Sequence, residues 1–177
     1  DTWTGLSASP ACNEFTKEQF SLNVSDPYAV RWIVENGDGQ AWAQEIGFSQ
    51  PILFAPPREC NADDSRVTLK FVQPNDGQKI ESSLIDVFAQ VDATSDFRNY
   101  SLSFGLGDEP VDWKVLLDRD QVVAQPDKIY TWNLLESFPD GLPTGTISLR
   151  LVINSVRNTT AEKIIRLNFQ VPTLTPT

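Results

Sequence analysis

From residue 65 onward, apolar and polar residues alternate in short runs that turn residues separate. Alternation at every second position is the pattern of a strand with one buried face. It predicts seven strands, over residues 67–71, 84–91, 97–104, 113–117, 129–134, 146–153 and 164–171. Pro74-Asn75-Asp76-Gly77 predicts a turn, because proline fixes φ and glycine accepts positive φ. Such strands predict an immunoglobulin-like or fibronectin-III-like β-sandwich over residues 66–171.

Residues 1–65 carry helix and turn signals instead. Asp26-Pro27 predicts a helix start, since aspartate caps helices and proline fits their first position. We expect that helix to end at Asn36-Gly37 and Asp38 to cap a second short helix that ends at Gly47. Alternation over residues 20–24 predicts a short strand. The predicted fold is therefore mainly β, with a small irregular α+β segment before the sandwich. Apolar residues at helical spacing support the two helices: Tyr28, Trp32, Ile33, Trp42 and Ile46.

Two cysteines, Cys12 and Cys60, bracket the first segment. An even cysteine count, an acidic composition and a Thr/Pro-rich end at residues 172–177 together fit a disulfide in an extracytoplasmic chain. We therefore expect a disulfide-closed, mixed linker subdomain over residues 1–65 and an extended linker over 172–177. Two unpaired buried thiols are the alternative.

The chain has 177 residues, 14 Lys and Arg against 24 Asp and Glu, and a formal charge of −10. Phosphate backbones and anionic membrane surfaces attract Lys and Arg, so nucleic-acid and membrane-surface binding are not expected. No apolar run approaches the roughly 20 residues of a membrane-spanning helix, which predicts a soluble fragment. Because residue 1 is Asp, we expect a processed or excised piece of a longer chain.

Composition also limits the chemistry that the chain can carry. It has no His, so His-based catalytic triads and His-ligated metal sites are excluded, and two cysteines cannot form a four-cysteine zinc site. We expect no cofactor and no metal, with Ca²⁺ binding by loop aspartates as the alternative. Gly105-Leu106-Gly107 predicts a hairpin loop, because it lacks the third glycine and the lysine of a phosphate loop. The aspartates considered for calcium are Asp92, Asp96, Asp108 and Asp112.

Five tryptophans are the most distinctive side chains. In small β domains tryptophan usually fills the core or seals an interface, but an exposed indole can also stack on a sugar ring. Trp113, beside the glycine loop, is the candidate ligand-binding residue.

Three stretches of the first sixty residues carry a resemblance: Asn23-Val-Ser-Asp-Pro-Tyr-Ala-Val-Arg-Trp32, Gln40-Ala-Trp-Ala-Gln-Glu45 and Ile52-Leu-Phe-Ala-Pro-Pro-Arg-Glu-Cys60. They resemble the segment that follows the transpeptidase domain in some bacterial class A, or bifunctional, penicillin-binding proteins. A sandwich that opens Phe71-Val-Gln-Pro-Asn-Asp-Gly77 and a Thr-Pro end follow in the same order. The transpeptidase elements Ser-x-x-Lys and Lys-Thr-Gly do not occur in this sequence. The resemblance therefore implies a non-catalytic C-terminal region, with the enzymatic domains upstream.

We accordingly expect an accessory region of a cell-envelope protein that positions a cell-wall-synthesising enzyme on peptidoglycan or on a partner protein. The alternative is a carbohydrate-binding or adhesion module of a secreted protein. An exposed, coplanar strip of aromatics around Trp113 would favour that alternative.

Overall fold

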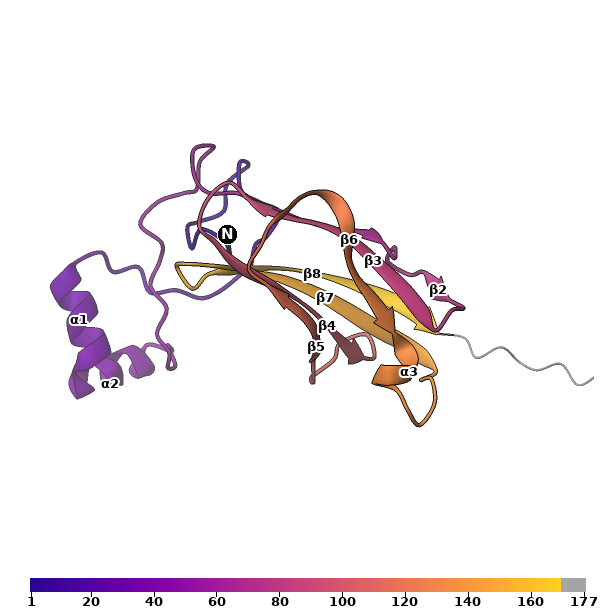
Figure 1. Cartoon of the computed structure of the whole chain (residues 1–177). Coiled ribbons are helices and arrows are strands. Elements are labelled where there is room, and N and C mark those ends of the chain that lie inside the picture. Colours follow the sequence, from indigo (N-terminus) through magenta and orange to yellow (C-terminus); the bar gives the residue numbers. More distant parts are fainter. Residues whose placement is uncertain (170–177) are drawn as a thin grey trace, which may run out of the picture. The chain divides into compact units, whose positions relative to one another are not determined.

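The computed structural model describes residues 1–169 and divides the chain into two units, Asp1–Asp64 and a second unit that begins at Ser65 (Figure 1). The expected linker at 172–177 lies outside the described residues, as do the last two positions of the seventh predicted strand. None of the helices formed by residues 1–169 has the length and apolar character needed to cross a bilayer.

The second unit is an immunoglobulin-like β-sandwich of two sheets (Figure 1). All strand pairs are antiparallel except the short pair between β2 and β8. The three-stranded sheet has the order β1 (Val67–Gln73), β3 (Leu84–Ala93), β6 (Val123–Asn133). The five-stranded sheet has the order β2 (Lys79–Ile80), β8 (Thr160–Phe169), β7 (Gly145–Ser155), β4 (Phe97–Leu106), β5 (Lys114–Arg119).

Alternating side chains of both sheets fill the space between them. Along the central strands the apolar residues at alternate positions are buried, as the alternation in the sequence predicts. Fully burying one such aliphatic side chain contributes about 1.5–3 kcal/mol. The buried hydrophobic residues of β3, β4 and β7 are Ile85, Val87, Ala89, Val91, Tyr100, Leu102, Phe104, Ile147, Leu149, Leu151 and Ile153.

All seven predicted strands form, and the structure adds β2. With two residues, β2 is too short to show an alternation in the sequence. The predicted turn before it is confirmed: Gly77 has φ 76° and donates its N–H to the carbonyl of Arg166 at 2.7 Å. The sequence also extended the fifth strand one residue too far, because Leu134 begins the short helix α3 (Leu134–Ser137). There the Asn133 side chain caps the helix by accepting the N–H of Leu135.

The first unit contains two helices, α1 (Pro27–Glu35) and α2 (Gly37–Glu45). The predicted cap of α1 is confirmed, since the Asp26 carboxylate accepts the N–H groups of Tyr28 and Ala29 at 2.8 and 2.9 Å. The predicted cap of α2 was wrong. Asn36, not Asp38, caps it by accepting the Asp38 N–H at 2.9 Å, because one asparagine both ends α1 and starts α2.

The strand predicted over residues 20–24 was also wrong, since only an isolated bridge between Leu22 and Phe54 forms there. The Leu22 N–H donates to the Leu53 carbonyl at 2.7 Å, and Leu22 is buried, whereas Phe20 is 94% exposed. The alternation therefore reflects a single anchoring residue rather than a continuous buried face.

A small core and one disulfide hold the first unit together. Leu22, Ile33 and Ala43 form the buried cluster, against which four partly buried residues pack. Cys12 and Cys60 are bonded, as predicted, and the bond closes 48 residues of chain. Near it, the Cys60 N–H donates to the Ser7 carbonyl at 2.9 Å. The four partly buried residues are Val24, Phe48, Ile52 and Phe54.

We predict that reducing Cys12–Cys60 loosens the first unit and leaves the sandwich folded. The chain-entropy model gives such a loop about 4 kcal/mol of stabilisation, which is large for a unit with so small a core. Hydrogen exchange with and without reductant is the measurement. Amide protection should fall within residues 1–64 and persist in the strands from Val67 onward. Simultaneous loss of protection in both units would contradict this independence.

Candidate functional site

Trp113, the residue singled out from the sequence, lies half-buried just before β5. The Arg150 guanidinium from β7 sits over its ring, 4.2 Å from the ring centroid. The Arg150 Nε also donates to the Ser103 hydroxyl on β4 at 3.4 Å. One face of the indole is thus occupied by a cation of the same chain.

The loop before Trp113 folds back onto β4. A Cβ added at Gly105 would lie 2.3 Å from the Pro110 Cβ, so only glycine allows this close approach. The Asp108 carbonyl accepts a hydrogen bond from the Arg166 Nε–H, with 3.2 Å between the two atoms. Gly107 has φ 89°, which suits a turn. The predicted hairpin loop is therefore confirmed. Trp113 follows this loop, and none of the aromatic ring pairs among residues 1–169 includes it.

The aspartates considered for calcium do not gather. The Asp96 carboxylate forms an ion pair with Arg157, and the Asp92 carboxylate accepts the N–H of Ala93 at 2.9 Å. Across residues 1–169, no three His, Cys, Asp or Glu side chains come together in a group that could hold a metal ion.

The other tryptophans divide between core and surface. Trp3 and Trp132 are each 1% exposed, and Trp132 packs against Phe104 with ring centroids 4.8 Å apart. Trp32 and Trp42, in contrast, are 44% and 38% exposed. Sequence reasoning placed both on helices but did not single them out as a surface.

Trp32 on α1 and Trp42 on α2 form a pair, with ring centroids 6.3 Å apart and ring planes at 46°. The helices approach closely at Gly39, where an added Cβ would lie 2.3 Å from the Trp32 carbonyl oxygen. Ala43, one turn further along the same face of α2, is fully buried and has a small side chain. Small residues on α2 therefore bring the two indoles together. We call Trp32 and Trp42 the indole pair.

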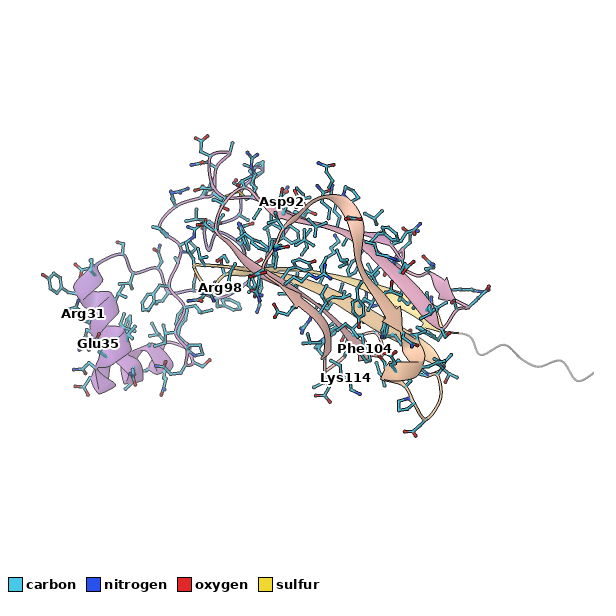
Figure 2. The ribbon with its side chains drawn as sticks, viewed as in Figure 1. Arg31, Glu35, Asp92, Arg98, Phe104 and Lys114 are labelled. Atoms are coloured by element: carbon cyan, nitrogen blue, oxygen red, sulfur yellow. A yellow bond between two sulfur atoms is a disulfide. The ribbon has the colours of Figure 1, made fainter. Side chains whose placement is uncertain are left out.

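Exposed carboxylates flank the indole pair. Side chains three or four residues apart share a helix face. Glu35 is three residues after Trp32, Asp38 four before Trp42 and Glu45 three after it, and all three carboxylates are exposed. Figure 2 shows Glu35 with Arg31 on α1, and Arg31 is the one basic residue between positions 26 and 45.

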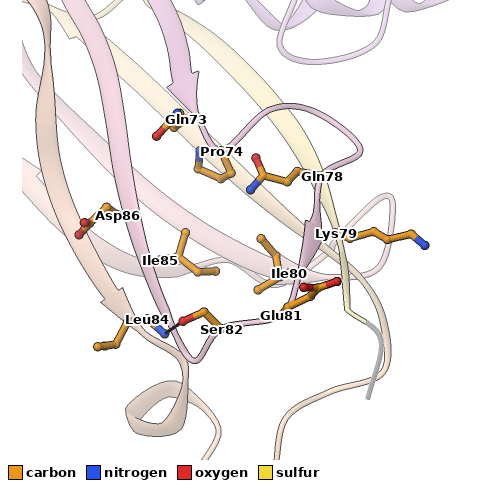
Figure 3. Close-up of a pocket in the computed structure, with 10 residues that line it drawn as sticks. All are labelled: Gln73, Pro74, Gln78, Lys79, Ile80, Glu81, Ser82, Leu84, Ile85 and Asp86. Atoms are coloured by element: carbon orange, nitrogen blue, oxygen red, sulfur yellow. Dashed lines mark hydrogen bonds between the residues drawn. The ribbon is translucent and has the colours of Figure 1, made fainter. Parts of the chain in front are cut away.

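The sandwich also has a hollow of about 420 Å³, where the chain leaves β1 and joins the other sheet as β2 (Figure 3). Three of its polar side chains already have partners. Gln78 accepts the Asn75 N–H, and Ser82 accepts the Leu84 N–H. A hydrogen bond from Thr131, with the nearby charge of Lys128, lowers the pKa of Asp86. The lining residues are Gln73, Pro74, Gln78, Lys79, Ile80, Glu81, Ser82, Leu84, Ile85 and Asp86.

These arrangements differ in what they leave available for a ligand. Trp113 shares a ring face with Arg150, and three of the polar side chains that line the hollow already have partners. The indole pair presents two exposed rings close together, beside charges that face water. It is the stronger candidate for contact with another molecule.

The glycine contact that sets the indole pair can be tested by two matched substitutions. Gly39→Ala should displace α2 from α1, destabilise the first unit by about 1–3 kcal/mol and alter the near-ultraviolet circular dichroism of the coupled indoles. Gly37→Ala meets no atom within 4 Å and should change neither. Thermal denaturation and near-ultraviolet spectra of both variants are the measurements. Equal behaviour of the two would show that the close approach does not set the pair.

No protein-family model matches the chain, and no curated protein matches it significantly. Several solved structures show a distant similarity to this chain, two of them as follows. One is an engineered protein, at 14% identity and TM-score 0.41 over 64% of this chain and 21% of the other. The second is a Cellulomonas fimi endo-beta-1,4-mannanase double mutant, at 14% identity and TM-score 0.35 over 62% of this chain and 19% of the other. The chain spans about a fifth of each, and likeness this distant carries no argument about function.

Proposed function

We propose that this chain is a non-catalytic accessory region of an extracytoplasmic, cell-wall-synthesising enzyme of the class A penicillin-binding protein type. Its role is to position that enzyme on peptidoglycan or on a partner protein. Two features support the proposal. The resemblance in sequence extends over both units, and the disulfide is typical of proteins from oxidising compartments.

The observation that carries a binding role is the exposed indole pair. The buried cluster of the first unit consists of Leu22, Ile33 and Ala43, so the unit has little apolar surface to spare. Trp32 and Trp42 are 44% and 38% exposed, so part of each indole adds nothing to the burial that stabilises the unit. Contiguous exposed apolar surface is a common feature of interaction sites. The unit therefore keeps aromatic surface in contact with solvent, where it is available to bind another molecule.

The carbohydrate-binding alternative depends on Trp113. Its half-buried ring leaves some indole surface beside the Arg150 guanidinium, and a guanidinium can donate hydrogen bonds to hydroxyl groups. That alternative called for a coplanar strip of aromatic rings around Trp113. None of the ring pairs found among residues 1–169 includes Trp113. The accessory role therefore has the stronger support.

We predict that the folded chain forms no covalent adduct with a fluorescent penicillin. The nucleophilic serine of Ser-x-x-Lys and the Lys-Thr-Gly element are absent from the sequence. Gel fluorescence after incubation is the measurement, with an active penicillin-binding protein as the positive control. An adduct on any serine of the folded chain would overturn the non-catalytic assignment.

We further predict that purified sacculi retain the chain weakly, and that Trp113→Ala leaves retention unchanged. Arg150 already covers one face of that ring, and a single aromatic platform is worth on the order of 1 kcal/mol. Co-sedimentation of wild type and variant is the measurement. Strong retention that Trp113→Ala abolishes would support the carbohydrate-binding alternative instead.

A further inference from the structure

We propose that the indole pair and its flanking carboxylates form a docking surface for a positively charged segment of another protein. The inference rests on the proposed function and names the chemistry of its partner. It depends on the geometry of the two helices of the first unit, and on the charge that they carry.

Further apolar side chains lie at helical spacing from the indole pair. Tyr28, 82% exposed, lies one helical turn before Trp32, and Ile46, 46% exposed, directly follows α2, four residues after Trp42. The indole centroids are 6.3 Å apart, so one incoming side chain can contact both rings. The two ring planes meet at 46°, so the pair does not form a flat platform. Such an angle suits a compact or elongated side chain better than a flat sugar ring.

The charge around the indoles selects the occupant. Glu35, Asp38 and Glu45 flank them at helical spacing, and each is exposed. Lysine and arginine are attracted to indole faces within about 6 Å of the ring centroid. The carboxylates add electrostatic attraction at longer range, which steers an encounter. An acidic rim around aromatic rings therefore fits a basic segment that also carries aliphatic groups.

The same charges disfavour the other occupants. A second copy of this chain would bring its own acidic rim and a formal charge of −10 to the contact. An anionic lipid surface is repelled for the same reason. A neutral glycan can donate hydroxyl hydrogen bonds to the three carboxylates but gains no charge attraction from them. A cationic polypeptide gains from both parts of the surface.

The sandwich contains the same kind of contact within the chain. There the Arg150 guanidinium lies 4.2 Å from the Trp113 centroid. We infer that a lysine or arginine of the partner makes an equivalent contact with Trp32 or Trp42.

The test uses the full chain with isotope-labelled tryptophan and an octapeptide of alternating lysine and leucine. We expect the peptide to shift the indole N–H signals of Trp32 and Trp42, and we expect added salt to weaken binding. A peptide of alternating glutamate and leucine should shift neither. Trp32→Ala with Trp42→Ala should weaken binding about tenfold, which corresponds to roughly 1.4 kcal/mol.

Charge variants keep the test sound if the tryptophan variant fails to fold. Glu35→Gln, Asp38→Asn and Glu45→Gln combined alter exposed groups, and should weaken binding about tenfold and flatten its salt dependence. Glu109→Gln, Asp120→Asn and Glu162→Gln make the same charge change on the sandwich and should preserve binding. Equal weakening by both triple variants would overturn the docking surface in favour of non-specific attraction.

A chito-oligosaccharide tests whether the indole pair binds a glycan instead of a basic peptide. If it shifts the two indole signals and the lysine-leucine peptide does not, the inference fails while the proposed accessory role on peptidoglycan survives. A penicillin adduct, in contrast, would overturn the proposed function and leave the docking result untouched.

Discussion

Alternation of apolar side chains along β3, β4 and β7 is the constraint on which the sandwich depends. Residues two apart point to one face of a strand, so these three strands put eleven buried side chains between the sheets. The outward positions are then free for polar groups and for close backbone contacts. Ser103 and Arg150 use such positions, and Gly105 allows Pro110 to pack on β4. The setting of Trp113 follows from that outer face.

The first unit obeys a different constraint, because it has too few buried side chains to define a fold by burial alone. Its buried cluster is small, and a covalent bond between Cys12 and Cys60 limits the unfolded chain instead. Caps at Asp26 and Asn36 then set the helix starts. Gly39 lets α2 lie against α1. Local hydrogen bonds and one crosslink thus replace a larger core.

The small core of the first unit is relevant to the proposed function. A unit held by caps, a glycine contact and a disulfide can leave large side chains outside its core and still fold. Trp32 and Trp42 occupy that position, beside carboxylates that remain in water. Trp132, which packs with Phe104 and donates its Nε1–H to Ser137 at 2.8 Å, is an ordinary core residue. The contrast shows that identical side chains end up buried or exposed according to the packing available around them.

The sequence alone determined the strands of the sandwich, the turn at Gly77, the cap at Asp26 and the Cys12–Cys60 bond, because each depends on local spacing or on cysteine count. The strand predicted at 20–24 was wrong, because only Leu22 is anchored there. The predicted cap of α2 was wrong, because Asn36 both ends α1 and caps α2. Local spacing does not encode which side chains from different elements meet. Only the tertiary structure therefore placed Arg150 on Trp113 and brought Trp32 to Trp42, because both contacts join residues from different elements.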